Sequence, residues 1–293
     1  MRSLRIGVIA DPHVALEERE GGSWHNPFHL ADSLARLRAA VQDPWLQPCD
    51  LLVVLGDVAH WGDAPTMRAV IRAVADTRRP VVVLSGNHDV LVPGVRLAEQ
   101  IRSVGAPLVT NPGAGLAGPA TTLLGEAGFA VEVHEVTALT ERDSTPFDVQ
   151  VSRVGTGDEP AGVVLSHFPV LSLESECADA GLRYAGHLDQ LAPIPPTPRR
   201  PACPTVILAG HLHLRGVAVE GELLQVVFAA LVEPPFDISR VELSLGPAGP
   251  TVSYESRPMQ PSTARLPVLA PPSGSWTWSV DRWAAVDRDP ELT

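Results

Sequence analysis

The sequence contains no lysine. All 22 of its basic residues are arginines, 34 residues are acidic, and the formal net charge at pH 7 is −12. A chain with this balance has no general attraction for a phosphate backbone, so we do not expect nucleic acid as a partner. Cysteine is scarce as well. Cys49, Cys177 and Cys203 are widely spaced, which argues against a disulfide framework or a zinc ribbon and fits a reducing compartment.

Long hydrophobic runs are also missing. The apolar stretch Ile6–Ala10 runs directly into Asp11 and is too short for the hydrophobic region of a signal peptide. No later run approaches the roughly 20 apolar residues that a membrane-spanning helix needs. We therefore expect a cytoplasmic protein without a membrane span. Hydrophobic residues still make up 45% of the 293 residues, which is enough for a sizeable core and excludes wholesale disorder.

Short apolar runs rich in Val, Ile and Leu indicate β-strands that are covered on both faces. A helical pattern follows each of the first three runs. One opens with Asn26 as N-cap and Pro27 at the first helical position, one begins after Asp63, and one ends before Gly105. This alternation predicts a largely parallel sheet in the N-terminal third of the chain. The five runs are Ile6–Ala10, Leu51–Leu55, Val81–Leu84, Val163–Leu165 and Val206–Ala209.

Beyond Gly105 the apolar runs become shorter and are punctuated by turns, which is typical of antiparallel strands. A two-sheet α/β sandwich accommodates both halves. We expect one domain over residues 1–256, and then, over 257–293, a proline-rich connector and a tail whose tryptophans pack on the body. The later runs are Thr121–Leu124, Phe129–Leu139, Phe147–Val154, Gly216–Val219, Leu223–Phe228 and Ile238–Leu245.

Each of the five Val/Ile/Leu-rich runs is followed by residue types that bind metal ions. Because ligands bind beyond the carboxyl ends of strands in open α/β sheets, five strand ends would bring these groups to one place. Carboxylate, imidazole and carboxamide groups without a thiolate suit Mn, Fe, Zn or Co ions and argue against a cysteine-type zinc site. In chain order the groups are Asp11 and His13, then Asp57, then Asn87, His88 and Asp89, then His167, and finally His211 and His213.

Two ions fit this set better than one. The potential ligands exceed what a single ion can bind while leaving room for a substrate, and a carboxylate between two ions is the recurrent arrangement of hydrolytic dinuclear sites. Glycine precedes Asp57, Asn87 and His211, where it lets the backbone turn sharply near the ions. Singly, each motif has an ordinary structural interpretation as a helix cap, a turn or a hydrogen-bonded histidine. Their joint occurrence in this order favours the metal site.

The ordered motifs Asp-x-His, Gly-Asp, Gly-Asn-His-Asp, His and Gly-His-x-His, between Asp11 and His213, resemble those of the calcineurin-like metallophosphoesterase superfamily. In detail they are similar to bacterial class III cyclic-nucleotide phosphodiesterases. The resemblance implies two mixed β-sheets sandwiched between helices, and a centre of two divalent or mixed-valence ions (Mn, Fe or Zn) bridged by Asp57. The family pattern places Asp11, His13, Asp57 and His213 around one ion, and Asp57, Asn87, His167 and His211 around the other.

The resemblance also implies catalytic roles for two further residues. His88 would contact the phosphate and protonate the leaving oxygen, and Asp89 would orient His88. The predicted function is hydrolysis of a small-molecule phosphodiester or phosphomonoester by attack of a metal-bound hydroxide, with diesters favoured. Two alternatives stay open. A nuclease of the double-strand-break repair type is disfavoured because the chain lacks a basic groove signature, and a non-catalytic scaffold is disfavoured because no ligand is missing.

Residues outside the motifs carry weaker predictions. Surface or hydrogen-bonded structural roles are expected for most of the other histidines. Arg215 follows the last motif closely and could contact a phosphate, but a solvated side chain is expected. His60 stands apart, because it follows Asp57 on the same predicted loop and could touch the substrate. The loop from Glu17 to Phe28 contains Trp24 and could line a wall for a nucleotide base. The other histidines are His25, His29, His134 and His187.

Overall fold

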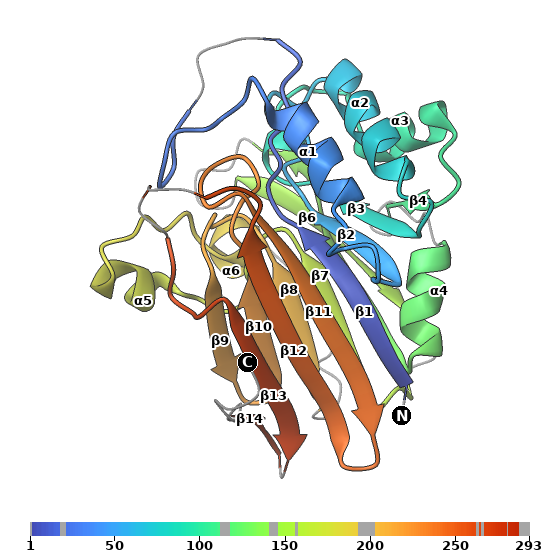
Figure 1. The fold of residues 1–293 in the computed structure, drawn as a ribbon, viewed down its shortest axis with the longest axis vertical. Helices are drawn as coiled ribbons and strands as arrows, with labels where there is room; N and C mark the ends of the chain where they lie inside the picture. The colour runs from blue at the N-terminus through green and yellow to red at the C-terminus, as the bar shows by residue number, and fades with distance from the viewer. Residues whose placement is uncertain are drawn as a thin grey trace.

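Two mixed β-sheets lie face to face, with helices packed along the outer side of one of them (Figure 1). They belong to a computed structural model that describes residues 2–17, 22–111, 118–140, 146–155, 158–192, 203–261, 264, 267–279 and 281–286. The arrangement is the α/β sandwich of two mixed sheets that the sequence predicts, and the predicted fold class is therefore confirmed. Within the described ranges no helix is both long and apolar enough to cross a membrane.

The two sheets contain eight and six strands. The first has the order β14-β13-β12-β11-β1-β2-β3-β4, with β1 Arg2–Ile9, β2 Leu51–Leu55, β3 Val81–Leu84, β4 Val109–Thr110, β11 Asp237–Gly246, β12 Gly249–Pro258, β13 Ser273–Ser279 and β14 Arg282–Ala285. The second has the order β6-β5-β7-β8-β10-β9, with β5 Phe129–Leu139, β6 Phe147–Val154, β7 Ala161–Ser166, β8 Thr205–Ala209, β9 Gly216–Glu220 and β10 Leu223–Val227. The helices are α1 Ser33–Gln42, α2 Ala64–Ala75, the 3₁₀ turn η1 His88–Val90, α3 Leu97–Val104, α4 Pro119–Glu126, α5 Glu174–Asp179 and α6 Leu188–Leu191.

The N-terminal third forms the predicted parallel unit. Strands β1, β2, β3 and β4 pair in parallel, and α1, α2 and α3 lie together along one side of them (Figure 1). Two predicted helix ends are confirmed. Asp63 Oδ1 accepts a hydrogen bond from the Thr66 amide at 2.9 Å and so caps α2, and Gly105 ends α3 in the left-handed conformation at φ 70°.

Two sequence predictions of local structure are wrong. The first helix begins at Ser33, and Asn26 does not cap it. Both the amide and the side chain of Asn26 bond a distant segment instead, since the amide donates to the Glu233 carboxylate and Nδ2 donates to the Pro234 carbonyl at 3.2 Å. Residues Thr121–Leu124 belong to helix α4 and not to a strand. Pro119 occupies the first turn of α4, and the Thr121 hydroxyl hydrogen-bonds the Gly118 backbone, so local capping prevails over the strand-like composition.

The expected antiparallel character of the second half holds only in part. Strands β5 and β6 are antiparallel, as are β9 and β10, but β5, β7, β8 and β10 pair in parallel. The second sheet therefore also presents several carboxyl ends on one edge. This edge contributes to the site described below.

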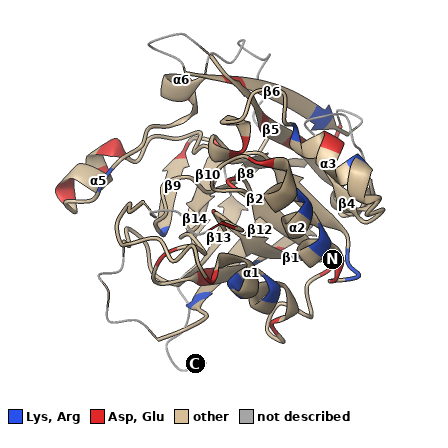
Figure 2. Cartoon of the chain, turned by 90° about the horizontal axis from the view of Figure 1, so that it is seen from above, with Lys and Arg blue, Asp and Glu red and all other residues tan. Residues whose placement is uncertain are grey.

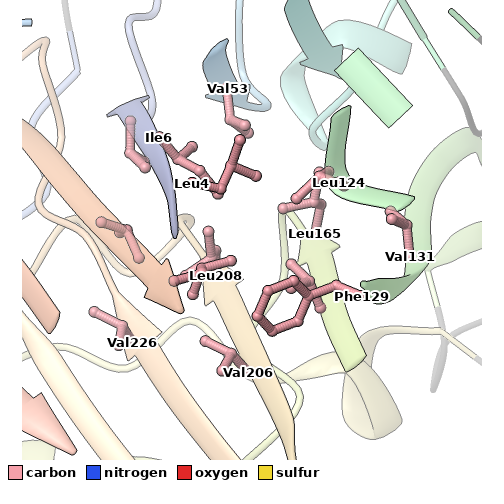
Figure 3. Close-up of a cluster of buried hydrophobic side chains, with 14 of the residues drawn as sticks. Leu4, Ile6, Val53, Leu124, Phe129, Val131, Leu165, Val206, Leu208 and Val226 are labelled. Atoms are coloured by element: carbon pink, nitrogen blue, oxygen red, sulfur yellow. The ribbon is translucent and has the colours of Figure 1, made fainter. Parts of the chain in front are cut away.

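The main core lies between the sheets. Inward-facing side chains of β1 and β2 meet those of β5, β7, β8 and β10, and α4 closes one end (Figure 3). A second cluster joins α1, α2 and α3 to the outer face of the first sheet, with alternate residues of each strand pointing each way. Burial on both faces explains why these strands read as continuous apolar runs.

The C-terminal residues add strands to the first sheet. Trp276 lies in β13 and stacks on Tyr254 of β12 with ring centroids 5.7 Å apart, and Trp283 of β14 is buried and donates its indole N–H to the Glu222 carbonyl. The expected boundary after residue 256 falls inside β12, two residues before its end at Pro258. The division of the chain into a domain and a tail stays a prediction, while the tryptophan segment contributes edge strands as well as packing.

Charged residues are dispersed over the described part of the chain. Figure 2 shows arginines on α1 and acidic residues on α5, at separate places on the molecule. The expectation that nucleic acid is not a partner stays a prediction.

Candidate metal centre

The predicted ligands follow five strands taken from both sheets. Strands β1, β2 and β3 end shortly before Asp11, Asp57 and Asn87, and strands β7 and β8 end shortly before His167 and His211. The two edges meet directly, because the His167 ring nitrogen Nδ1 lies 2.9 Å from the carbonyl oxygen at the end of β2. The topology therefore brings together side chains that are far apart in the sequence.

The backbone is left-handed at many of these positions. Asp11, His13, Asp57, His211 and His213 have φ values between 39° and 68°. This conformation is uncommon for residues other than glycine and persists only where the surrounding structure enforces it. Strain of this kind is typical of functional sites.

Glycine allows the closest backbone approach in the site. A Cβ atom at Gly86 would lie 2.2 Å from Asp57 Oδ1, and one at Gly210 would lie 2.7 Å from Asp11 Oδ2. The predicted reason for glycine before Asn87 and before His211 therefore agrees with the geometry.

A first cluster consists of Asp11, His13 and His213, whose ligand atoms lie within 4.8 Å of one another. The Nε2 atoms of His13 and His213 are 3.2 Å apart, and His213 Nε2 is 3.6 Å from Asp11 Oδ1. Asp57 also contacts this cluster, with its Oδ2 3.3 Å from His13 Nε2. All four side chains are buried.

A second cluster consists of Asp57, Asn87 and His167. His167 Nε2 lies 2.9 Å from Asn87 Oδ1 and 3.5 Å from Asp57 Oδ1. Asp11 is near as well, with its Oδ1 3.8 Å from His167 Nδ1. The His211 ring lies 5.1 Å from the His167 ring, and its Nε2 faces the Ala185 carbonyl at 3.4 Å. Asp57 thus turns one carboxylate oxygen toward each cluster.

The donor set fits metal ions. In the first cluster both Nδ1 atoms face other side chains, His60 and Glu233, while the Nε2 atoms of His13 and His213 converge. When the ring protons of His13 and His213 lie on Nδ1, their Nε2 lone pairs and the carboxylate oxygens point into one buried space. Burying these electron-rich atoms together is unfavourable unless a cation lies between them. Metal–nitrogen bonds of about 2.0–2.1 Å in a tetrahedral site separate two ligand atoms by about 3.3 Å. The observed separation of 3.2 Å agrees with this value.

Burial and neighbouring charges shift the pKa values of the same groups. Burial raises the pKa of Asp11 to about 6. Burial alone would raise the pKa of Asp57 too, but the neighbouring histidines, led by His167, outweigh it and lower that pKa. Burial lowers the pKa of His13 well below its ordinary value and that of His211 to about 3. These two imidazoles are therefore neutral at neutral pH, the form that binds metals.

Supporting residues orient the ligands. Glu233 is fully buried, and its Oε1 lies 2.8 Å from His213 Nδ1 while its Oε2 accepts from the Asn26 amide. Sequence reasoning missed Glu233. The available signal was a lone acidic residue directly after the long apolar segment 223–232. Carboxylate partners of this kind fix the tautomer of a metal-binding histidine.

The structure changes the expected action of Asp89. Its carboxylate is buried and accepts backbone N–H groups from Gly86, Val58 and Ala59 at 2.8–3.0 Å. It therefore ties the loop after β2 to the loop after β3. The His88 ring is held by a different group, since its Nδ1 lies 2.8 Å from the His60 carbonyl oxygen.

The surroundings contain further predicted residues. Phe28 stacks on His13 with ring centroids 5.2 Å apart, and His25 Nε2 lies 3.0 Å from the Leu212 carbonyl, so the loop that contains Trp24 adjoins the centre. A cavity of about 190 Å³ is lined by Trp24 and His25 together with Arg183.

Arg215, expected to be solvated, is instead buried in an ion pair with Asp237. Two of the histidines outside the motifs are buried as well. His134 is 6% exposed and bonds Glu132, whereas His60 is 4% exposed and lies against His13 and His88. The side chains of His25, His29 and His187 keep more exposure.

Comparison with known proteins gives a family match. The model of the family described as calcineurin-like phosphoesterase matches residues 4–215, which include all the predicted ligands. A probable cyclic nucleotide phosphodiesterase of Rhodopseudomonas palustris is 30% identical over 88 residues, which are 29% of this chain and 30% of that protein. The structure of a dimetal phosphatase from Danio rerio superposes with a TM-score of 0.50 at 14% identity, over 87% of this chain and 96% of that one.

Proposed function

We propose, since the chain belongs to the calcineurin-like phosphoesterase family, that it is a phosphoester hydrolase with a dinuclear metal centre. Small-molecule phosphodiesters are the proposed preferred substrates. The diester preference rests on the motif pattern and on the partial match to a probable cyclic nucleotide phosphodiesterase, of whose length the match spans 30%. We propose manganese, iron or zinc as the metals because carboxylate, imidazole and carboxamide ligands suit them.

The observation that carries the proposal is the position of Asp57 between the two clusters. Its Oδ2 lies 3.3 Å from His13 Nε2 and its Oδ1 lies 3.5 Å from His167 Nε2. A carboxylate with one oxygen toward each of two ligand sets supports a bridging role between two ions. The proposed ligands are Asp11, His13, Asp57 and His213 for one ion, and Asp57, Asn87, His167 and His211 for the other.

Two ions bound there would lower the pKa of water toward neutrality and neutralise charge on the phosphoryl oxygens. The protein supplies the remaining groups. His88 is fixed through its backbone N–H, which donates to Asp57 Oδ1 at 2.8 Å, and through Nδ1, which donates to the His60 carbonyl. In its imidazolium form the ring carries a second proton on Nε2, which it gives to the leaving oxygen. Asp89 keeps the two loops in register, so its proposed contribution is positioning.

The loop before α1 supports recognition of an aromatic group in the substrate. Phe28 covers the first cluster, and Trp24 lies beside Arg183, whose guanidinium carbon is 5.6 Å from the indole centroid. An aromatic ring and a cation next to a phosphoryl site suit a nucleotide-like diester. We propose this wall as the substrate-binding side of the centre.

The test combines metal analysis and hydrolysis. Purified protein is analysed for bound metal and assayed with bis(p-nitrophenyl) phosphate and with p-nitrophenyl phosphate, each with and without Mn²⁺. Two ions per chain and faster diester turnover would support the whole proposal. Faster monoester turnover would overturn the diester preference alone. No metal and no turnover would point to a non-catalytic protein of the same fold.

A further inference from the structure

His60 lies inside the metal centre although none of the motifs includes it. Its loop is joined to the loop of His13 by backbone hydrogen bonds, from the His13 amide to the Asp57 carbonyl and from the His60 amide to the Val14 carbonyl, each 2.9 Å long. These bonds bring the two rings together, and His60 Nδ1 is 3.1 Å from His13 Nδ1. The contact is therefore fixed by the backbone.

A contact between two Nδ1 atoms restricts where the ring protons lie. A hydrogen bond between two nitrogens needs one N–H group and one lone pair. His13 turns Nε2 toward His213 and Asp57, so Nε2 is the atom available to a metal and must be unprotonated. The single proton of neutral His13 is then on Nδ1 and is donated to His60. His60 Nδ1 accepts it, and the proton of His60 is on Nε2.

The Nε2–H group of His60 has no acceptor among the residues that the structure describes. The ring nevertheless has a fixed orientation, because it lies edge-on to Trp61 with centroids 4.4 Å apart and edge-on to Phe28 at 5.6 Å. It also lies face to face with His88, with centroids 5.0 Å apart and planes at 24°. Nitrogen atoms of His13, His60 and His88 come within 4.8 Å of one another. A fixed donor thus lies beside the proposed acid.

We propose that His60 is a positioning residue for His13 and that its Nε2–H group donates to a phosphoryl oxygen of the substrate. The inference rests on the proposed function, because it uses metal binding by His13. A preorganised neutral donor suits this place, since negative charge gathers on the phosphoryl oxygens during the reaction. His60 would thereby connect the first cluster with the leaving-group side of the site.

Two variants separate the two roles. His60→Asn places an amide oxygen near the position of Nδ1, so it keeps an acceptor for His13 but loses the outer donor. His60→Gln reaches the position of Nε2, so it keeps an outer donor but loses the acceptor. Both variants leave the backbone carbonyl that holds His88. His29→Asn is the matched control, since His29 is an exposed histidine that bonds no member of the centre through its side chain.

The expected results differ in kind. His60→Gln should weaken binding of the first metal ion by about 10–100-fold, measured by calorimetry with Zn²⁺. His60→Asn should keep Zn²⁺ affinity near that of the wild type but weaken inhibition by inorganic phosphate by about tenfold, the loss of one hydrogen bond to a charged group. Equal and small effects of both variants on Zn²⁺ and phosphate binding would overturn the inference.

The proton positions give a readout that is independent of turnover. Long-range ¹H–¹⁵N NMR spectra of the Zn²⁺-loaded protein should show His13 protonated on Nδ1 and His60 protonated on Nε2. A proton on His60 Nδ1 in protein that binds two Zn²⁺ ions would overturn this inference and leave the proposed function standing. Failure of the wild type to bind Zn²⁺ at all would overturn the proposed function, and this inference with it.

Discussion

The two sides of the metal centre hold their histidines by different means. In the first cluster both histidines are oriented by side chains, with His13 bonded to His60 at 3.1 Å and His213 bonded to Glu233 at 2.8 Å. In the second cluster the orienting group is backbone, since His167 Nδ1 faces the carbonyl oxygen of the last residue of β2 at 2.9 Å. One side therefore depends on the identity of distant side chains, and the other depends on the fold itself.

This difference predicts unequal responses to mutation. A side-chain support can be removed by one substitution, and such partners contribute about 10–100-fold to metal affinity. A backbone carbonyl at a strand end persists under any substitution that preserves the sheet. The first ion should therefore be the one whose affinity can be altered separately, while the second ion should change only with its own ligands.

The largest effect is expected where the two sides meet. Asp57→Asn removes the negative charge from the carboxylate that faces both clusters, so both ions should be lost and turnover should fall to background. Metal content and diester hydrolysis of the purified variant check this. Retention of either ion at wild-type affinity would show that Asp57 does not serve both sides. Asp63→Asn is a suitable control, because this carboxylate caps α2 through the Thr66 amide and asparagine can replace it as a cap.

A smaller effect is expected for His88, which is proposed to contact the substrate and not a metal ion. His88→Ala should keep both ions and reduce turnover by about 10² or more, because it removes the proposed acid. This result would distinguish His88 from the supports His60 and Glu233, whose removal is expected to weaken metal binding. Metal loss equal to that of Asp57→Asn would contradict the division of roles between ligand and acid.

Glu233→Gln tests the comparison directly. The amide keeps an oxygen acceptor but not the charge, so the bond to His213 or the bond to the Asn26 amide is lost. We expect affinity for the first ion to fall by about 10–100-fold while affinity for the second stays within error. Zn²⁺ titration calorimetry resolves the two steps. Equal weakening of both steps would show that the two sides are not independent, and Glu220→Gln on the exposed end of β9 is the control.

Residues at strand ends could be predicted from the sequence, whereas the side chains that support them could not. The proposed ligands were visible in the sequence because each lies within a few residues after an apolar strand, and parallel strands bring their carboxyl ends together. The side-chain supports could not, because the contacts of Glu233 with His213 and of His60 with His13 exist only in the folded chain. The sequence singles out His60 as a substrate contact and not as a support. The fold class followed from strand and helix patterns in the same way. Local capping around Gly118 and the long-range use of Asn26 were not visible in hydrophobic periodicity, and there the predictions failed.

The smallest effect on activity is expected for a buried acid that holds the loop before Asn87 and not a histidine ring. Glu135 is buried and its Oε1 accepts from the Ser85 amide, two residues before Asn87, and from Asn111 Nδ2. Burial raises the pKa of Glu135 from 4.5 to about 7, despite these hydrogen bonds. The acid is thus neutral in the folded protein at pH 5 and charged at pH 9.

Because the pKa of Glu135 is higher in the folded state, its contribution to stability is present at low pH and is lost as pH rises through about 7. Glu135→Gln keeps an oxygen acceptor for the Ser85 amide and carries no charge at any pH. From pH 5 to pH 9, we expect the free energy of unfolding of the variant to rise relative to that of the wild type by at most about 3 kcal/mol. Urea unfolding of the metal-free proteins measures this. If the difference in unfolding free energy between the variant and the wild type is the same at both pH values, a group other than Glu135 titrates. Turnover near neutral pH should change little, because the variant keeps the hydrogen bond that holds the Asn87 loop.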